Sequence, residues 1–233
     1  MTKLNKFISD SGCCSRRKAA DLIKDGQVTV NGTITLEPYY EVQEKDAIKV
    51  NNKLIQHDTH KLYFLFNKPQ DVITTASDPQ GRRTVMDFFK RIKSRVFPVG
   101  RLDRNTTGVM LVTNDGDLTQ KLSHPKFGVS KTYHVTTHKP VTKEHMELLL
   151  KGVKLEDGFM KVDKVRRLTQ RKNSISVTIH SGKKHVVKRL FKQLRYFVER
   201  LDRTRFAGLT KQGLPLGTYR PLLKEEIQKL KDL

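Results

Sequence analysis

Apolar residues at the start of the chain recur with the spacing of two short helices followed by a small sheet. Segment 4–8 is apolar on one helical face, and a second helical run begins at Ser15, a suitable N-cap, and stops at Gly26. Segments 28–30 and 47–50 follow as short strands, the first ending in an Asn-Gly pair that is typical of a hairpin. This pattern predicts a small helix-helix-sheet domain.

The remainder of the chain mixes strands and helices without a regular strand-helix-strand order. The expected strands cover residues 61–66, 108–113, 131–137 and 174–179, and the expected helices cover 85–91, 142–150, 184–194 and the end of the chain from 223. We therefore predict an α+β fold in which a larger mixed sheet is mostly antiparallel. A short polar linker at 56–60 separates the two domains, which we place at residues 1–57 and 61–233.

Net charge is the strongest compositional signal. The 233 residues contain 46 Lys and Arg against 24 Asp and Glu, for a formal net charge of +22. Residues 1–60 are nearly balanced, with 9 basic and 8 acidic side chains, whereas residues 61–233 carry 37 and 16. Such an excess indicates a polyanionic partner. We expect a nucleic acid rather than a membrane, since no basic amphipathic helix presents an apolar anchor face.

The sequence also lacks the marks of a membrane or secreted protein. No run approaches the roughly 20 apolar residues of a membrane span, and the first residues lack the apolar core of a signal peptide. Cys13 and Cys14 are adjacent and have no other cysteine to pair with, which favours two free thiols in a reducing compartment. We therefore expect a cytoplasmic protein.

Common cofactor and metal motifs are missing as well. Gly182-Lys183 does not belong to a phosphate-binding P-loop, because Val177 stands where that motif needs glycine. The dinucleotide motif G-x-G-x-x-G, the zinc motifs C-x-x-C and H-E-x-x-H, and the serine-hydrolase motif G-x-S-x-G do not occur. We expect neither a metal nor a cofactor.

The stretch from Leu4 to Gly32 resembles the S4 RNA-binding domain. It fits the pattern L-N-K-x-I-x-x-S-G-x-x-S-R-R-x-A-x-x-L-I-x-x-G-x-V-x-V-N-G. In that family the second helix lies on RNA, so the resemblance implies phosphate contacts from Arg16, Arg17 and Lys18. A solvated helix start is the alternative for this cluster. Basic side chains there oppose the helix dipole, however, and an external anion would offset that cost.

One carboxylate is distinguished by its surroundings. Asp103 lies in the string G-R-L-D-R-N-T-T-G at 100–108, and T-N-D-G follows at 113–116 after a buried strand. Taken alone, a loop aspartate most often caps a turn through its short side chain. The whole string, however, resembles the signature of the pseudouridine synthases that modify ribosomal RNA, of the RsuA/RluB type. That resemblance implies that Asp103 is the catalytic nucleophile.

Two further segments carry the same resemblance. Lys131-Thr132-Tyr133 is similar to the K-x-Y segment of the family, whose tyrosine packs against the target base; a lone tyrosine would be read as a core residue. Segment 182–191 is similar to G-R-x-[HR]-[QE]-V-[RK]-R-M-F, in which the residue at the position of Lys188 pairs with the catalytic aspartate. The implied catalytic set is Asp103, Tyr133 and Lys188.

Contacts with RNA are expected from eight basic side chains, which lie in the segments that carry the two resemblances. They are Arg16, Arg17, Lys18, Lys68, Arg101, Lys183, Lys184 and Arg189. For Arg189, a solvated helix face remains an open alternative.

The sequence departs from the family pattern at three positions. Asn67-Lys68-Pro69 resembles the opening N-K-P-x-G, but Asp71 replaces the glycine, which permits more backbone conformations. Val186 replaces a Gln or Glu, and Lys183 replaces an arginine that can hold a phosphate with two bonds. None of these changes removes a catalytic group.

The resemblance implies an enzyme that isomerises one uridine of ribosomal RNA to pseudouridine. The reaction moves ribose from N1 to C5 of uracil, which needs a buried anionic group, a wall for the base, and a uridine turned out of its stack. It requires no cofactor. Segment 118–125 is closer to large-subunit enzymes, so we expect 23S rather than 16S rRNA as the partner, alone or in a pre-ribosomal particle. We also expect a monomer without membrane contact.

Two other interpretations stay open. A non-catalytic RNA-binding or ribosome-assembly factor could keep the same fold, and Asp71 and Val186 are the features that favour it. A DNA-binding regulator is less compatible with the sequence, because nothing resembles a helix-turn-helix dimer. Release of tritium from uridine labelled at C5 would separate an enzyme from a binder.

Overall fold

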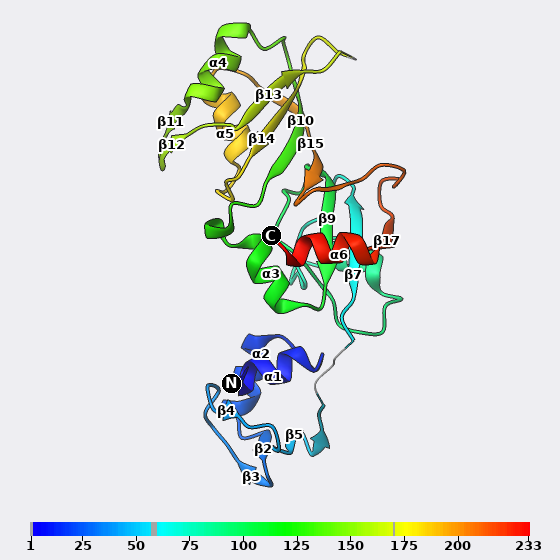
Figure 1. Ribbon diagram of the computed structural model, residues 1–233. Helices are drawn as coiled ribbons and strands as arrows, with labels where there is room; N and C mark the ends of the chain where they lie inside the picture. Colours follow the sequence, from blue (N-terminus) through cyan, green and yellow to red (C-terminus); the bar gives the residue numbers. More distant parts are fainter. Residues whose placement is uncertain (1, 57–59, 170) are drawn as a thin grey trace. The chain divides into compact units, whose positions relative to one another are not determined.

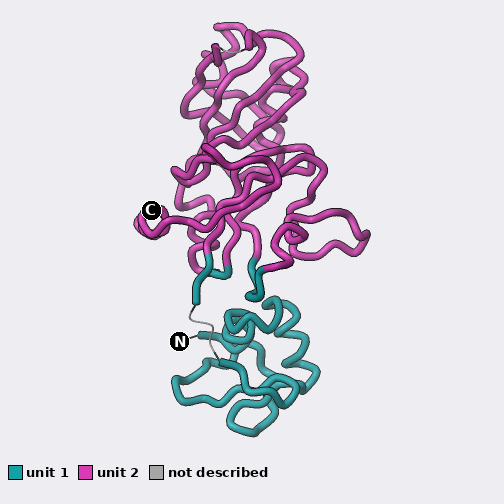
Figure 2. The backbone as a smooth tube through the Cα atoms, turned by 90° about the vertical axis from the view of Figure 1, so that its right-hand side faces the viewer, with its two compact units in different colours: residues 1–62, 92–96, 114–116 teal, residues 63–91, 97–113, 117–233 magenta. Residues whose placement is uncertain are grey.

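The computed structural model of the protein describes residues 2–56, 60–169 and 171–233. The chain forms two compact units. The first contains residues up to 62 with 92–96 and 114–116, and the second contains 63–91, 97–113 and 117–233 (Figure 2). The linker expected at 56–60 lies partly outside the described residues, so the division into domains at 1–57 and 61–233 stays a prediction. No helix among the described residues is long and apolar enough to cross a membrane.

The first unit combines two helices with a four-stranded antiparallel sheet. The helices are α1 (Leu4–Asp10) and α2 (Arg16–Lys24), and the sheet order is β3 (Thr33–Ile34), β2 (Val28–Val30), β5 (Ile48–Val50) and β6 (Lys53–Leu54) (Figure 1). A separate two-stranded ribbon pairs β1 (Thr2–Lys3) with β4 (Glu41–Val42).

The local signals of the first unit act as the sequence predicts. The hydroxyl of Ser15 accepts from the Lys18 amide and caps α2. The Asn31-Gly32 pair has positive φ at both residues, +53° and +86°, which matches the twist of the β2–β3 hairpin. The apolar faces of both helices then bury against the sheet, with Leu4, Ile8 and Ile23 fully inside.

The second unit is built on a large, mostly antiparallel sheet. Its strand order is β13 (Lys164–Arg167), β14 (Ser174–Ile179), β10 (Lys131–Thr137), β15 (Val198–Phe206), β9 (Thr107–Thr113), β7 (Tyr63–Lys68) and β17 (Tyr219–Pro221). The short strands β8 (Phe97–Pro98) and β16 (Leu209–Thr210) pair with β9 and β15, and a separate hairpin joins β11 (Val153–Leu155) to β12 (Gly158–Met160). Together with the first unit, this confirms the predicted α+β class.

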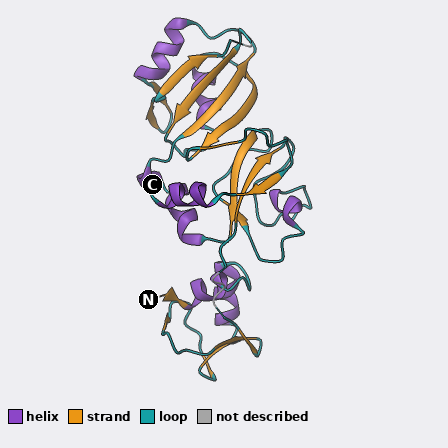
Figure 3. Cartoon of the chain, turned by 45° about the vertical axis from the view of Figure 1, so that its right-hand side comes forward, coloured by secondary structure: helices purple, strands orange, loops and turns teal. Residues whose placement is uncertain are grey.

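Helices cover the sheet on both sides. The helices α3 (Gly116–Ser123) and α6 (Lys224–Lys231) lie side by side and bury Leu118, Leu122 and Leu230 against β7 and β9 (Figures 1 and 3). The 3₁₀ helix η1 (Val85–Phe89) stacks its aromatic rings on Phe66 of β7 and Tyr219 of β17. Farther along, α4 (Lys143–Lys151) contacts β13, and α5 (Val186–Gln193) contacts β11 and β15. A second 3₁₀ turn, η2, covers Pro125–Phe127.

Three predicted segments differ from the structure in detail. The strand expected at 61–66 runs from 63 to 68, because its pairing with β9 extends to Lys68 opposite Gly108. The helix expected at 85–91 is a 3₁₀ turn of five residues. The helix expected at 184–194 starts at 186, because His185 has a left-handed backbone conformation with φ at +52°.

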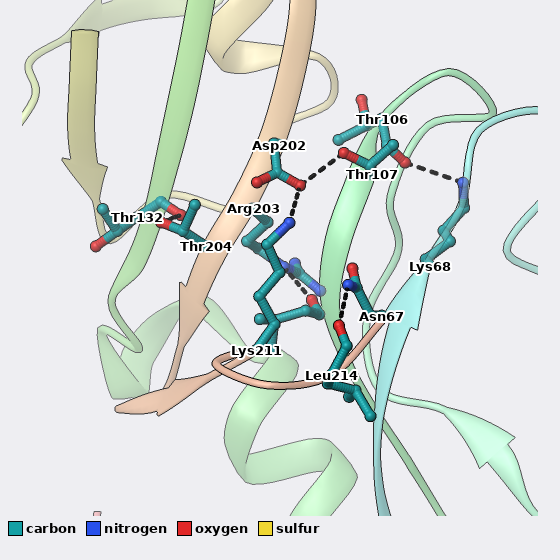
Figure 4. A network of polar contacts seen from close by, with 11 residues as sticks. Asn67, Lys68, Thr106, Thr107, Thr132, Asp202, Arg203, Thr204, Lys211 and Leu214 are labelled. Carbon is teal, nitrogen blue, oxygen red and sulfur yellow. Dashed lines mark hydrogen bonds and ion pairs between the residues drawn. The ribbon is translucent and has the colours of Figure 1, made fainter. Parts of the chain in front are cut away.

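The second unit depends on a close approach between β9 and β15, which run parallel. Gly108 pairs with Arg203, and Thr107 pairs with Asp202. A Cβ at Gly108 would lie 2.7 Å from the backbone nitrogen of Arg203, and the φ of Gly108 is +112°. The contact is reinforced on one side, where the Asp202 carboxylate accepts from the Thr107 hydroxyl at 2.6 Å and from Lys211 at 2.6 Å (Figure 4).

We predict that Gly108→Ala lowers the free energy of unfolding by more than about 3 kcal/mol, because two backbones and an added methyl group cannot share this space. Gly128→Ala is the control, since Gly128 is left-handed but has no atom within 4 Å of the added Cβ; it should cost about 1 kcal/mol. Urea titrations of both variants give the comparison. Equal losses would show that the β9–β15 approach is not a constraint.

Candidate functional site

Asp103 lies in the loop that leads into β9, and the loop backbone is fixed beside it. The hydroxyl of Thr74 donates to the carbonyl of Leu102 at 2.8 Å, and the Thr106 amide donates to the carbonyl of Asp103 at 3.0 Å. Leu102 itself is buried. A loop held on both sides of its acidic residue keeps that carboxylate in one position.

Lys68 ties the same loop to the end of β7 from the protein interior. Its side chain is fully buried, and its Nζ donates to the carbonyl oxygens of Pro69 (2.9 Å), Thr106 (3.0 Å) and Arg104 (3.1 Å). Figure 4 shows the bond to Thr106. Burial lowers the pKa of Lys68 to about 8, while the charge of Asp103 acts in the opposite direction. The prediction that Lys68 contacts RNA is therefore wrong, because all three of its protons are used inside the protein.

The carboxylate of Asp103 lies between two basic side chains from the start of α5. Nζ of Lys188 is 2.8 Å from Oδ2, and Nε2 of His185 is 3.2 Å from Oδ1. The Asp103 side chain is 28% exposed, so it is neither sealed in the core nor on the open surface. The sequence indicated the pairing with Lys188, whereas the contact with His185 comes from the left-handed residue before the helix.

A cavity of about 470 Å³ opens beside this pair of contacts. Its walls include the Asp103 loop, Tyr133 of β10, segment 181–187 and the middle of β15. Tyr133 is nearly buried in the wall, and Lys188 reaches the Asp103 carboxylate from α5. The structure thus places Asp103 and Tyr133 in the wall of one cavity, with Lys188 in contact with Asp103, although their catalytic roles stay predictions.

Two cations in the cavity wall were not singled out by the sequence. Arg203 of β15 is 2% exposed, donates through Nε to the carbonyl of Val109 at 2.7 Å, and lies 4.6 Å over the ring of Phe206. Lys131 of β10 is partly buried, and burial followed by the charge of Arg203 lowers its pKa to about 8. Both residues therefore add positive charge to the lining of the cavity.

Asp71 has a left-handed backbone conformation, which glycine adopts more readily than other residues. Its φ is +62°, and its carboxylate accepts from Nε of Arg104 at 2.6 Å, next to Asp103 in the chain. The substituted residue therefore costs some backbone strain and gains an ion pair with the Asp103 loop. Val186 is buried where α5 meets the sheet, so it acts in packing.

The remaining residues that were expected to contact RNA divide into two groups. Exposed positions are held by Arg16, Arg17 and Lys18 on α2, by Arg101 beside the cavity, and by Lys184 in the loop before α5. Lys183 and Arg189 are instead engaged with Asp157, which accepts two bonds from Arg189 at 2.8 and 3.0 Å and a backbone contact from Lys183 at 2.7 Å.

Within residues 2–56, 60–169 and 171–233, no cluster of three or more His, Cys, Asp or Glu side chains could hold a metal ion. The acidic side chain at the cavity, Asp103, has basic neighbours instead.

Two family sequence models match the chain. The one described as RNA pseudouridylate synthase matches residues 62–193, and the one described as S4 domain matches residues 2–48. The large-subunit pseudouridine synthase B of Bacillus subtilis strain 168 is 39% identical over 237 aligned residues, which cover 100% of this chain and 97% of that protein. The dual-specificity RNA pseudouridine synthase RluF of Escherichia coli strain K12 is 35% identical over 97% of this chain and 77% of that protein.

A solved structure is similar over the same extent. The crystal structure of a pseudouridylate synthase superposes with a TM-score of 0.70 at 29% identity, covering 99% of this chain and 100% of the other. The similarity therefore covers both compact units, and the fold predicted from the sequence is confirmed.

We predict that Lys68→Met lowers the free energy of unfolding by about 2–4 kcal/mol. Three carbonyl oxygens lose their shared donor, and a buried acceptor without a partner costs about 1–3 kcal/mol before relaxation. Lys184→Met, the same change at an exposed position, should stay within about 0.5 kcal/mol. An unchanged urea midpoint for Lys68→Met would contradict the tie between β7 and the Asp103 loop.

Proposed function

This chain belongs to the RNA pseudouridylate synthase family, and we propose on that premise that it converts one uridine of large-subunit ribosomal RNA to pseudouridine. The observation that carries the proposal is the Asp103 carboxylate at the wall of a nucleoside-sized cavity, with Lys188 at 2.8 Å and Tyr133 beside it. At about 470 Å³, the cavity falls within the range of about 300–1,000 Å³ that is usual for small-molecule sites.

In the proposed reaction, Asp103 acts on the ribose of a uridine that has left its stack. The bond between C1′ and N1 breaks, uracil turns within the cavity, and C1′ joins C5. Asp103 serves either as a nucleophile, whose bond to C1′ breaks when C5 attacks, or as a base that takes the C2′ proton to form a glycal and later returns it. Its position beside the cavity is compatible with both routes. Lys188 balances the negative charge of the carboxylate while no substrate is bound, and His185 lies 3.2 Å from its other oxygen.

Tyr133 is proposed to form the wall against which the flipped base packs. It belongs to β10, whose neighbours β14 and β15 hold it on both sides. A rigid aromatic wall keeps the uracil near the ribose after the glycosidic bond breaks, which favours rejoining over loss of the base. Atoms and electrons balance without an external reagent, so the reaction as proposed uses no cofactor.

Ribosomal RNA as the substrate rests on the relatives and on charge. The Bacillus subtilis relative is named for the large ribosomal subunit. Exposed Arg16, Arg17 and Lys18 on α2 and Arg101 and Lys184 at the cavity supply phosphate contacts, as expected for a chain with a net charge of +22. Four further points stay predictions. They are the use of 23S rather than 16S rRNA, the form of the substrate (free RNA or a pre-ribosomal particle), a monomeric state and a cytoplasmic location.

We predict that Asp103→Asn binds rRNA with unchanged affinity but releases no tritium from transcripts labelled at C5 of uridine. The amide keeps the shape of the side chain but removes the anionic oxygen that the reaction requires. Asp232→Asn, the same change near the chain end, should release tritium at the wild-type rate. Release by the Asp103 variant at that rate would contradict the assignment, and no release by the wild-type protein would contradict the proposed function.

We predict that the double change Arg16→Ala with Arg17→Ala reduces the slope of log affinity against log salt by roughly 1.5, since about 0.7–0.9 counterions are released per phosphate contact. Filter binding of an rRNA transcript at several salt concentrations measures it. Lys224→Ala with Lys229→Ala on α6 removes the same charge elsewhere and should leave the slope nearly unchanged. Equal slopes for both double variants would show that α2 does not touch phosphate.

A further inference from the structure

The side chains of Tyr133 and Arg203 meet at the cavity wall. The two residues are directly opposite each other on the paired strands β10 and β15. The pairing shifts between the pairs Thr132–Arg205 and Tyr133–Arg203, so Thr204 forms a bulge there. Bulges redirect side chains, and they are common beside active sites. Both side chains line the cavity, and the Tyr133 hydroxyl is near enough to the Arg203 guanidinium to act against the lowering of its pKa.

Arg203 has little freedom to move away from that hydroxyl. Its Nε donates to the carbonyl of Val109, its plane lies over Phe206, and Gly108 lets its backbone approach β9. Figure 4 shows the Arg203 side chain with its hydrogen bond. Its Nη2 is buried and has no hydrogen-bond partner among the described residues. A buried guanidinium with an unused donor is costly in a purely structural position.

Among the described residues, no carboxylate forms an ion pair with Arg203, as one would in an ordinary buried ion pair. Burial lowers the pKa of Arg203, and among the described residues the group that favours its charged form is the hydroxyl of Tyr133. Lys131 adds a second positive charge close by. The carboxylate of Asp103 is already engaged by Lys188 and His185. The side of the cavity that contains Arg203 and Lys131 is therefore positively charged and can stabilise a negative charge that forms during the reaction.

The proposed reaction creates such a charge on the base. When the C1′–N1 bond breaks, its electron pair stays with uracil and spreads over N1, O2 and O4. This holds whether Asp103 bonds to C1′ or a glycal forms. The charge lasts until C5 has bonded to C1′, after which the C5 proton passes to water, N1 takes up a proton, and the ring regains its conjugation. Fixed dipoles aimed at such a transient charge speed reactions more than any interaction present from the start.

We propose that Arg203 is a positioning residue that acts through Tyr133. The guanidinium donates to the phenolic oxygen, so the Tyr133 hydroxyl proton points into the cavity and donates to a carbonyl oxygen of the uracil anion. Arg203 thus stabilises the detached base without touching it. The inference rests on the proposed function, because it concerns the same cavity and the same reaction.

The first test is a double-mutant cycle on single-turnover tritium release from a 23S rRNA transcript labelled at C5 of uridine. Tyr133→Phe and Arg203→Lys should each slow release on the order of 10²-fold, as loss of an oxyanion donor does. The double variant should be no more than about threefold slower than Tyr133→Phe alone, because Arg203 acts through the hydroxyl. Arg205→Lys, an exposed arginine two residues along β15, is the matched control and should keep the wild-type rate.

The second test changes the stability of the anion rather than the protein. Fluorine at C5 withdraws electrons, so 5-fluorouracil is a better leaving group than uracil. In transcripts that contain 5-fluorouridine, the reaction is followed as the rate at which 5-fluorouridine disappears from nuclease digests. The factor by which Tyr133→Phe or Arg203→Lys slows this reaction should be at least tenfold smaller than the factor by which it slows the uridine reaction. A purely structural defect would slow both substrates equally.

The outcomes separate this inference from the proposed function. Equal slowing of uridine and 5-fluorouridine by Tyr133→Phe overturns the inference, and this comparison stands even if Arg203→Lys does not fold, as judged by its urea midpoint. The inference is also overturned if the double variant slows tritium release by the product of the two single-variant factors. Absence of tritium release by the wild-type protein would instead overturn the proposed function.

Discussion

The close approach of two parallel backbones at Gly108 and Arg203 is the constraint on which the second unit depends. It joins the half of the sheet that contains β7 and β9 to the half that contains β15, β10 and β14. A side chain at Gly108 would force these halves apart. The Asp103 loop leads into β9, on one side of this junction. Tyr133 belongs to β10, which pairs with β15 on the other side of the junction. The last glycine of the string at 100–108 therefore sets the distance between the acid and the aromatic wall.

Positive charge has different tasks at different depths of this protein. The ammonium group of Lys68 donates hydrogen bonds to three carbonyl oxygens and so fixes the shape of the Asp103 loop. Lys188 and His185 meet the carboxylate directly. Arg203 lies behind Tyr133, and the exposed cations face solvent, where they can meet phosphate. A net charge of +22 thus says little about which cation does what, and burial and partners decide it.

Much of the fold was predictable because its signals are local. The cap at Ser15, the hairpin at Asn31-Gly32, and the alternation in 131–137 and 174–179 each specify an element without help from distant residues. The shifted start of β7 was not predictable, since its register is set by pairing with β9. Likewise, a helical pattern over 184–194 does not reveal that His185 turns left-handed before the helix begins.

Site residues could be predicted from the sequence where they belong to a recognisable motif. They could not be predicted where the role of the side chain depends on how deeply it is buried. The segments around Asp103, Tyr133 and Lys188 identified residues that the structure brings together. Lys68 was misassigned because a lysine in a loop motif resembles a phosphate ligand until its burial is known. Arg203 did carry a signal, since it shares the inward side of β15 with Leu201, where an arginine needs a reason to be buried.

Mapping of pseudouridines in ribosomal RNA shows whether Asp103 is needed to isomerise a uridine in the cell. Carbodiimide-stop primer extension would be applied to 23S and 16S rRNA from cells with the intact gene, without it, and with Asp103→Asn in its place. We expect one stop in 23S rRNA that is present with the intact gene and lost in both other strains. The same stops in all three strains, or a stop that survives in the Asp103→Asn strain, would contradict it.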